Sequence, residues 1–410
     1  MTDNLVIYHL HSDNSLLDSC TGYKLYIDRA AELGQPAIAF SEHGKPLNWV
    51  KKKMYCDEKG IKYIHGVEIY LTESLNEKVR DNYHTVLIAR NEQGVKELNL
   101  AVSKSCDKDH FYYVNRLSFD EFLKLSNNII TTSACLASPL NKLPVDHPMY
   151  ESLVKRYDFL EIQAHDCQEQ RDFNVHLAEL AKKYGKPLIA GTDTHSLDKY
   201  KAECRKILLK YKNKSYGDED TYDLTYKSRE ELDAAFGRQG VLPSELYRQA
   251  MDNTLVMADM VEPFELDTSI KYPILYGSAE EDSRIEAERV DRMFKEKLES
   301  GVIPPEQEEA FRAALAEERK IFEKVGMNGF MLCESELICW CKEHGIAIGP
   351  GRGSVSGSRT AFVTDITDCN PEQWHTAFAR FCHEDRVEPA DIDTDCIDKD
   401  RPKIFQYIID

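Results

Sequence analysis

The first half of the chain alternates short apolar segments with amphipathic helical ones, and this alternation limits the fold more than any other feature. Seven segments rich in β-branched or apolar residues read as strands. They are residues 4–9, 36–41, 61–71, 84–89, 128–133, 158–163 and 187–191. Four helical patterns lie between them, at residues 23–34, 49–60, 92–104 and 170–185. Repeated strand and helix units predict a parallel β/α architecture, and seven strands favour a barrel.

Turn and loop signals divide the rest of the chain. Gly34 and Gly185 directly follow two helical patterns, where a C-cap glycine is expected. The polar segment 212–224 predicts an exposed loop. Further helical patterns follow at residues 228–237, 244–261, 283–301 and 305–326, and a short strand is predicted at 345–349. The segment 262–278 has the Pro and Gly of a connection, which predicts a boundary near residue 272 between domains at 1–272 and 273–410.

Composition narrows the functional classes. The 410 residues are 42% hydrophobic, with no apolar run long enough for a membrane span and no secretion signal at the start, so a cytoplasmic protein is expected. The twelve cysteines show no Cys-x-x-Cys spacing, which disfavours a zinc ribbon or a disulfide scaffold. The net charge of −19 argues against a chain whose whole surface binds nucleic acid.

Two histidines, His9 and His11, stand at the end of the first predicted strand, and Asp18 follows closely. Side chains at positions i and i+2 of a strand point to the same face, about 7 Å apart. This spacing suits two ligands of a metal site. An isolated pair of histidines is more often a surface or core feature, so the rest of the chain decides between the two interpretations.

Further metal-ligand residue types occur at the ends of the later predicted strands. They are His43, Glu68, His84, Cys135, Asp193 and His195. In a β/α barrel the strand ends converge on one face, so all nine side chains are expected around one pocket. Imidazole, thiolate and carboxylate groups together select zinc, manganese or iron rather than calcium. Nine ligands are too many for one ion, so two or three ions are expected, and such a cluster activates water for phosphoester hydrolysis.

A second motif lies in residues 346–358, IAIGPGRGSVSGS, which predict a strand, a glycine-rich turn and a helix. Such a turn brings backbone N–H groups close to phosphate oxygens, and a helix N-terminus adds partial positive charge. The sequence matches neither the P-loop pattern, because no lysine follows, nor the dinucleotide fingerprint, since Ser356 replaces the third glycine. Arg352 is a forked donor suited to phosphate, which favours a phosphate site over a generic glycine turn.

Three aspartates, Asp391, Asp393 and Asp395, alternate further along the chain. Alternation places them on one strand face, where their charges repel unless cations are bound. Two magnesium ions about 4 Å apart align a 3′ hydroxyl with an incoming triphosphate. An acidic solvated strand is the alternative, and the apolar stretch that follows at 404–409 weakens it.

The order of the first set of motifs, HLHSDNSLLDS, EHG, GVEIY, HTVLIA, SACLAS and GTDTH, resembles the polymerase and histidinol phosphatase (PHP) domain. The resemblance implies a distorted seven-stranded β/α barrel with a trinuclear metal site. It assigns the ligands to His9, His11, Asp18, His43, Glu68, His84, Cys135, Asp193 and His195. None of the nine is replaced, whereas some members of the family have lost several ligands and keep the domain as a scaffold.

GPGRGS and DIDTDC together resemble motifs of the family C replicative DNA polymerases, the alpha subunits of bacterial DNA polymerase III. The resemblance implies that residues 273–410 form the N-terminal part of a polymerase β-like (nucleotidyltransferase) α+β palm. The ungapped register from Arg386 to Cys396 assigns the catalytic, metal-binding pair to Asp393 and Asp395. The residues expected at the triphosphate are Arg352, Gly353 and Ser354.

The two resemblances imply the N-terminal portion of a DNA-directed DNA polymerase that uses dNTPs by two-metal nucleotidyl transfer. Two Mg²⁺ ions are expected in the complete palm, and two or three Zn²⁺ or Mn²⁺ ions in the PHP site, which would act as a phosphoesterase or 3′–5′ exonuclease. Primer-template DNA is an expected partner, as are the thumb and fingers that the family carries beyond this region, the sliding clamp and other replisome subunits. A free-standing phosphatase for a small phosphate ester is the alternative. A non-catalytic scaffold is a third interpretation, which nine intact ligands oppose.

Overall fold

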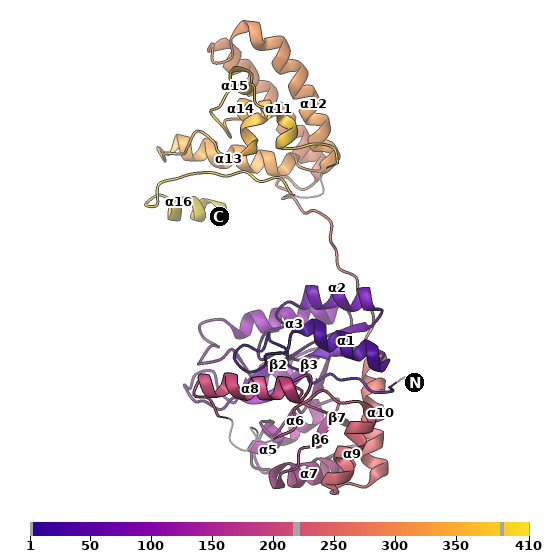
Figure 1. The fold of residues 1–410 in the computed structure, drawn as a ribbon. Helices are drawn as coiled ribbons and strands as arrows, with labels where there is room; N and C mark the ends of the chain where they lie inside the picture. The colour runs from indigo at the N-terminus through magenta and orange to yellow at the C-terminus, as the bar shows by residue number, and fades with distance from the viewer. Residues whose placement is uncertain (1–2, 216–221, 386–388, 410) are drawn as a thin grey trace. The chain divides into compact units, whose positions relative to one another are not determined.

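The computed structural model describes residues 3–215, 222–385 and 389–409 and divides the chain into two compact units, Met1–Leu266 and Asp267–Asp410. The first unit holds all the described β-strands, whereas the second is helical (Figure 1). The division falls just before residue 272, where the sequence predicts a boundary. Part of the predicted loop at 212–224, residues 216–221, lies outside the described residues.

Seven strands are described in the first unit. They are β1 (Ala37–Phe40), β2 (Lys62–Thr72), β3 (Tyr83–Ala89), β4 (Arg116–Ser118), β5 (Ile129–Thr132), β6 (Leu160–Gln163) and β7 (Leu188–Gly191). Six of the seven predicted segments form strands among these, and only the short β4 was not predicted. The first predicted segment, residues 4–9, pairs through isolated bridges, Ile7 with Ile38 and Leu10 with Thr194.

The sheet is mixed rather than fully parallel, so the predicted all-parallel arrangement is wrong at β3. β1 pairs with β2, β2 with β4 and β6 with β7 in parallel, but β3 runs antiparallel to both of its neighbours, β2 and β5. The reason lies in the connection at residues 73–82, which contains no helix. A parallel return needs a crossover of about a dozen residues or more, usually a helix, whereas a shorter link joins antiparallel strands.

Isolated bridges connect the sheets to one another. Thr132, at the end of β5, bridges to Phe159 before β6, and Thr194 after β7 bridges back to Leu10. One buried apolar cluster gathers side chains from the first segment and from β1, β2, β3, β5 and β7, together with Phe159 just before β6. Its members include Val6, Tyr8, Ala39, Ile64, Val86, Ile88, Ile130, Phe159 and Ile189, with Met257 from a helix.

Helices surround these strands and bury a larger apolar core against their outer faces. The first unit contains α1 (Tyr23–Leu33), α2 (Trp49–Lys59), α3 (Glu92–Ser105), α4 (Phe119–Leu123), α5 (Pro139–Lys142), α6 (Tyr150–Arg156), α7 (Gln168–Tyr184), α8 (Lys199–Tyr211), α9 (Arg229–Gln239) and α10 (Ser244–Asp259). The four predicted helices of the alternating region are confirmed as α1, α2, α3 and α7. Gly34 and Gly185 end α1 and α7 with φ of 71° and 65°, which confirms the predicted C-caps.

The second unit contains α11 (Ala279–Glu299), η2 (Pro305–Gln307), α12 (Glu308–Val325), α13 (Asn328–Glu343), η3 (Ser354–Gly357), α14 (Arg359–Val363), α15 (Pro371–Trp374), η4 (Phe378–Arg380) and α16 (Arg401–Ile409). The predicted helices at 283–301 and 305–326 are confirmed as α11 and α12. The predicted strand at 345–349 is wrong: in the described part of this unit, Ile348 forms only an isolated antiparallel bridge with Cys396.

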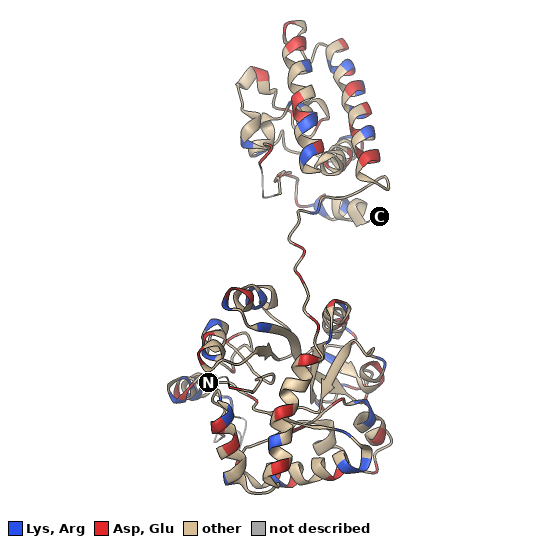
Figure 2. Cartoon of the chain, turned by 90° about the vertical axis from the view of Figure 1, so that its right-hand side faces the viewer, with Lys and Arg blue, Asp and Glu red and all other residues tan. Residues whose placement is uncertain are grey.

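Lys and Arg residues are interspersed with Asp and Glu along the helices of both units (Figure 2). Many form ion pairs one turn apart, such as Arg284 with Glu288 and Arg312 with Glu308. Such exposed pairs contribute little to stability, because solvent and salt screen their charges. Among the helices that the structure describes, none is both long and apolar enough to cross a membrane.

Candidate metal centre and the glycine-aspartate segment

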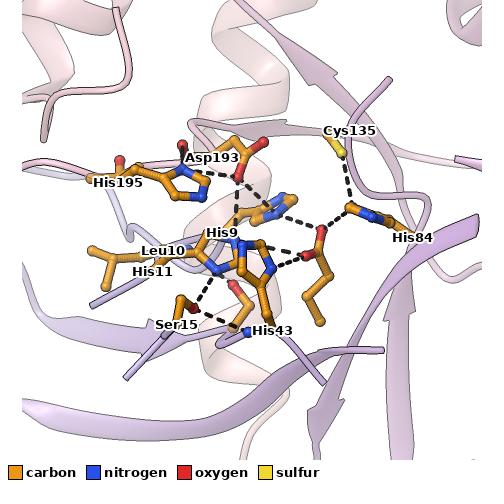
Figure 3. Close-up of polar contacts among 12 residues, drawn as sticks. His9, Leu10, His11, Ser15, His43, His84, Cys135, Asp193 and His195 are labelled. Atoms are coloured by element: carbon orange, nitrogen blue, oxygen red, sulfur yellow. Dashed lines mark hydrogen bonds and ion pairs between the residues drawn. The ribbon is translucent and has the colours of Figure 1, made fainter. Parts of the chain in front are cut away.

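The structure brings all nine predicted ligands of the first unit together at one end of its strands (Figure 3). His84 opens β3, and because β3 runs opposite to its neighbours this places His84 at the same end as the residues that follow β1, β5 and β7. His9 and His11 lie around a bend in the first segment, with ring centroids 5.4 Å apart. The predicted convergence is therefore present in the structure.

Glu68 lies in the middle of the cluster. Its Oε2 is 2.8 Å from Nδ1 of His43, and its Oε1 is 2.9 Å from Nδ1 of His84 and 3.4 Å from Nε2 of His9. The Cys135 thiol lies 3.5 Å from Nδ1 of His84. Glu68, His84 and Cys135 thus form one group whose ligand atoms all lie within 4.8 Å of one another.

Two further carboxylates complete the cluster. Oδ1 of Asp193 is 3.3 Å from Nε2 of His9 and 3.2 Å from Nε2 of His11. Oδ2 of Asp18 is 3.0 Å from Nε2 of His43 and 3.4 Å from Nε2 of His195. Two more groups of ligand atoms within 4.8 Å result, one of His9, His11 and Asp193 and the other of His11, His43 and His195.

Four of these ligand atoms are buried without a hydrogen-bond partner among the described residues. They are Nε2 of His9, Nε2 of His11, Nε2 of His195 and Oδ1 of Asp193. An unsatisfied buried polar atom costs about 1–3 kcal/mol, so four in one place need a common partner. Divalent transition metals accept lone pairs from this mixed set of imidazole, carboxylate and thiol ligands, and the residues therefore fit a metal cluster.

The other nitrogen of each unsatisfied histidine is held by a neighbour. Nδ1 of His9 is 2.6 Å from Oε1 of the buried Glu161, and Nδ1 of His195 is 2.9 Å from the backbone carbonyl of Asp193. A carboxylate or carbonyl only accepts, so each Nδ1 donates a proton, and Nε2 is the nitrogen that can bind a metal ion when the ring is neutral. This is the tautomer that a metal ion requires at Nε2.

His11 is fixed in the same tautomer through a serine. The Ser15 hydroxyl donates its single proton to Oε2 of Glu42 at 2.6 Å, because a carboxylate cannot donate in return. Ser15 Oγ must then accept from Nδ1 of His11 at 3.0 Å, and it also accepts from the backbone N–H of His43 at 3.1 Å. Glu42 is itself held by the buried Lys52, whose Nζ lies 2.5 Å from Oε1.

The charge states within the cluster follow from burial and neighbours. Burial, together with the positive charges of His43 and His195, lowers the pKa of His11 to about 3, so its imidazole is neutral. Burial alone would raise the pKa of Glu68, but His84 and His43 outweigh it and hold that pKa well below its usual range. His11 is thus a neutral ligand and Glu68 an ionised one.

Asp193 and its neighbourhood show how closely the backbone is shaped around the cluster. Asp193 has φ of 45°, a left-handed conformation that is uncommon outside glycine and occurs at functional sites. Two residues earlier, a Cβ on Gly191 would lie 1.9 Å from Oε1 of Glu161. Only glycine at this position leaves room for the carboxylate that orients His9.

The glycine and aspartate motifs of the second unit also meet. Arg352 and Asp393 form an antiparallel bridge, and a guanidinium nitrogen of Arg352 lies 2.8 Å from Oδ1 of Asp393 and another 3.3 Å from Oδ1 of Asp395. Gly353 has φ of 80°, and a Cβ there would lie 3.5 Å from Oδ2 of Asp393. The hydrogen bond from Arg352 lowers the pKa of Asp393. Arg352 is therefore the cation paired with Asp393 and Asp395 in this structure.

Two details of this segment differ from the prediction. The aspartates do not lie on a described strand, since only Asp393 forms a bridge, an isolated one with Arg352, and part of the predicted register, residues 386–388, falls outside the described residues. The turn leads into η3, which begins at Ser354, and not directly into a helix. The next helix, α14, has its first N–H groups bonded by the buried Glu318, with Oε1 2.9 Å from the N of Arg359. Its N-terminus is therefore not free for a phosphate.

Comparison with known proteins assigns both units. A family model for the PHP domain matches residues 8–166, and one for the bacterial DNA polymerase III alpha NTPase domain matches residues 288–410. The DNA polymerase III subunit alpha of Aquifex aeolicus is 29% identical over 436 aligned residues, which cover 100% of this chain. The corresponding subunit of Helicobacter pylori strain J99 is 27% identical and matches 98% of the chain.

The chain thus combines a PHP domain with a bacterial DNA polymerase III alpha NTPase domain and is similar along its length to DNA polymerase III alpha subunits. It spans about 37% of the length of the Aquifex subunit and 36% of the Helicobacter one. Among solved structures, a two-domain protein from Bacteroides vulgatus containing a predicted PHP-like metal-dependent phosphoesterase matches 57% of the chain and 62% of its own, with 13% identity and a TM-score of 0.33. An amidohydrolase from Chromobacterium violaceum matches 46% of the chain and 87% of its own, with 14% identity and a TM-score of 0.30.

Several residues of this chain that surround the candidate metal site were not predicted from the sequence. Glu161 orients His9, Ser15 and Glu42 orient His11, and Arg205 on α8 bonds Oδ1 of Asp18 at 2.9 Å. The sequence carried a signal for one of these residues, because Glu161 is a carboxylate in the middle of an apolar strand pattern. A charge at such a position is almost never fully buried unless it is paired.

Proposed function

We propose that the first unit is a metal-dependent phosphoesterase whose nine ligands bind two or three ions of zinc or manganese. The observation that carries the proposal is the convergence of four unsatisfied buried ligand atoms with Glu68, His43, His84 and Cys135. When bound, such ions lower the pKa of water and neutralise the oxygens of a phosphate ester.

We infer that the first unit is a distorted seven-stranded barrel of the PHP type. The strand pairings and isolated bridges lead from the first segment through β1, β2, β3, β5, β6 and β7 and back to the first segment. Strands in a closed barrel direct alternate side chains to a shared interior. The apolar cluster shared by the first segment, β1, β2, β3, β5, β7 and Phe159 beside β6 supports this inference.

The chain's own residues prepare the site for this chemistry. Glu161, Ser15 and the Asp193 carbonyl hold three imidazoles with their Nε2 lone pairs directed into the cluster. Arg205 fixes Asp18. Because these partners are buried and already bonded, the ligands need little reorganisation when a phosphoester binds. The proposed substrates are phosphodiesters, with 3′–5′ exonuclease action on DNA as the activity suited to a polymerase subunit.

For the second unit, we propose a part in the active site of a replicative DNA polymerase. Asp393 and Asp395 are the proposed catalytic pair that would hold two Mg²⁺ ions, with Arg352, Gly353 and Ser354 at the triphosphate of an incoming dNTP. The meeting of Arg352 with both carboxylates supports the grouping of these residues. Primer-template DNA, the thumb and fingers, and the sliding clamp are partners proposed for the complete polymerase.

Hydrolysis of bis(p-nitrophenyl) phosphate by the manganese-loaded chain tests the phosphoesterase. Release of p-nitrophenolate is expected, and it should fall at least a hundredfold in Asp193→Ala and in His43→Ala, because loss of a ligand disturbs the activated water. Far-ultraviolet circular dichroism and thermal unfolding show whether each variant is folded. Activity that survives in both folded variants would mean that the cluster is not the site.

A further inference from the structure

A cavity in the first unit lies beside strand ends that lead to the candidate metal cluster. It has a volume of about 200 Å³ and lies where residues 164–166 leave β6 and Gly191 and Thr192 leave β7. The same two strands carry Glu161, which orients His9, and lead into Asp193. A ligand with its phosphate at the cluster therefore has a pocket beside it for another part of the same molecule.

The walls of this pocket suit a flat ring. His165 and Tyr222 stack with ring centroids 4.8 Å apart and an interplanar angle of 14°. Leu232 and Ala235 on α9 add apolar surface. Aromatic side chains bind nucleobases by stacking, independently of the base, and apolar neighbours add to the area removed from water.

The carboxylates of the pocket are already paired. Asp166 forms an ion pair with Arg171. Asp223 lies 3.0 Å from Nζ of Lys227, which also donates to the hydroxyl of Thr225 at 2.7 Å. These groups offer no free negative charge to a ligand.

Arg238, on α9, is different. It lines the pocket, is exposed, and has no ion pair or hydrogen bond with any residue that the structure describes. Among the described residues that line the pocket, the uncompensated charge is therefore positive. A guanidinium binds phosphate oxygens through its forked donors, so the free charge favours an anionic ligand over one with an ammonium group.

One polar atom in the pocket wall also lacks a partner. His165 is 8% exposed, and its Nε2 is buried without a hydrogen bond among the described residues. A buried nitrogen in this state gains from any ligand or water that bonds it. The edge of a nucleobase carries such donors and acceptors, whereas an aliphatic leaving group does not.

We propose that this pocket is a nucleoside subsite of the phosphoesterase centre, with the base against Tyr222 and a second phosphate of the substrate on Arg238. The inference rests on the proposed function and deepens it, because it names the residues that select nucleotides over other phosphate esters.

Calorimetric titration of the manganese-loaded 410-residue chain tests the subsite without requiring turnover. Three probes are compared. Inorganic phosphate should bind only at the metals, and thymidine 5′-monophosphate should also place its base against Tyr222. Thymidine 3′,5′-bisphosphate should, in addition, place its second phosphate on Arg238. Tyr222→Ala should lower the affinity for both nucleotides about tenfold, because one stacking contact is lost, and should leave the affinity for phosphate unchanged. Arg238→Ala should lower the affinity for the bisphosphate about tenfold and the affinity for the monophosphate less than about twofold.

Matched controls are Tyr200→Ala, an exposed tyrosine on α8, and Arg248→Ala, an exposed arginine on α10, and both should bind all probes like the parent. Tyr222→Phe keeps the ring and should bind thymidine 5′-monophosphate normally, which guards against a folding defect in Tyr222→Ala. Equal nucleotide binding in parent, Tyr222→Ala and Arg238→Ala would overturn the subsite. So would a loss of phosphate binding in either variant, or ethanolamine phosphate binding more tightly than the nucleotides. If phosphate and nucleotides bind as expected but no ester is hydrolysed, the proposed function fails and the subsite stands.

Discussion

At the scale of single residues, the proposed metal centre depends on groups that are not themselves proposed ligands. His9, His11 and His195 each have one nitrogen bonded to a neighbour and the other buried without a partner among the described residues. Glu161 is the clearest of these neighbours, since it is fully buried and also accepts hydrogen bonds from Thr132 and Gln163. Its charge raises the basicity of His9 and fixes the ring.

Glu161→Gln tests this role because it keeps the shape of the side chain and removes its charge. We expect the affinity for Zn²⁺ to fall about 10–100-fold, the usual effect of losing a partner that orients a ligand. Competition with a chromophoric chelator measures it. Glu151→Gln, an exposed glutamate on α6 paired with Lys155, is the control and should bind Zn²⁺ like the parent. Equal affinity in all three proteins would show that Glu161 does not support the site.

At the scale of elements, the sequence predicted the strands and helices of the first unit better than their directions. Apolar runs and C-cap glycines marked six strands and the helices α1, α2, α3 and α7, because local patterns determine them. The reversal of β3 was missed, since pairing between strands depends on connections and on distant residues. In the second unit, the Gly349 region predicted a strand, but its backbone bonds Asp395 at a single point, Gly349 N to Asp395 O at 2.9 Å.

The candidate site shows the same division. Its nine ligand types and their positions at strand ends were visible in the sequence, and the structure places them together. The partners Ser15, Glu42 and Arg205 were not found, because nothing local distinguishes a serine or arginine that bonds a ligand from one on the surface. The capping of α14 by Glu318, forty-one residues before Arg359, is likewise a long-range contact that no local pattern predicts.

One helix of the second unit carries a prediction about pH. Glu286 on α11 is buried, and burial raises its pKa to about 7, with Arg319 and Asn328 offsetting part of the effect and Glu318 and Glu323 adding to it. In the unfolded chain this carboxyl titrates near its ordinary value of 4.5. Between these two values the unfolded state releases a proton that the folded state keeps. The contribution of Glu286 to the free energy of unfolding should therefore fall as pH rises from about 4.5 to 7 and level off above that range.

Glu286→Gln is neutral at every pH and should remove this decline. At pH 8 we expect it to raise the free energy of unfolding by about 1–3 kcal/mol relative to the parent, with a smaller difference at pH 4.5. Urea unfolding followed by tryptophan fluorescence measures both. Glu288→Gln, on the exposed face of the same helix and paired with Arg284, should keep the pH dependence of the parent. A pH profile of Glu286→Gln that matches the parent's would contradict the assignment.

At the scale of the whole molecule, the chain carries two proposed sites with separate metals, one in each unit. The polymerase site is proposed for a complete enzyme, since this chain spans about 37% of the Aquifex subunit that it resembles. Within this chain, Asp393 and Asp395 face Arg352, and the rest of the proposed palm would correspond to parts of the Aquifex subunit that this chain does not span. Two-metal transfer depends on positioning and charge stabilisation by all of these parts.

We therefore predict that the 410-residue chain alone does not extend a primer, and that the remainder of the polymerase restores extension. The restored activity should disappear with Asp393→Ala or Asp395→Ala and persist with His9→Ala, because the two sites use different metals. A gel assay with a labelled primer and all four dNTPs measures it. Extension by the chain alone, or its loss with His9→Ala, would contradict the proposed division of labour.

The central claim, a metal cluster in the first unit, is tested most directly by the metal content of the chain. Inductively coupled plasma mass spectrometry of protein purified without chelator should find two or three transition-metal ions per chain, because nine ligands form three adjoining groups. His9→Ala combined with His11→Ala should lower that number by at least one, with the protein still folded. Fewer than one ion per chain, unchanged by the two substitutions, would contradict the account.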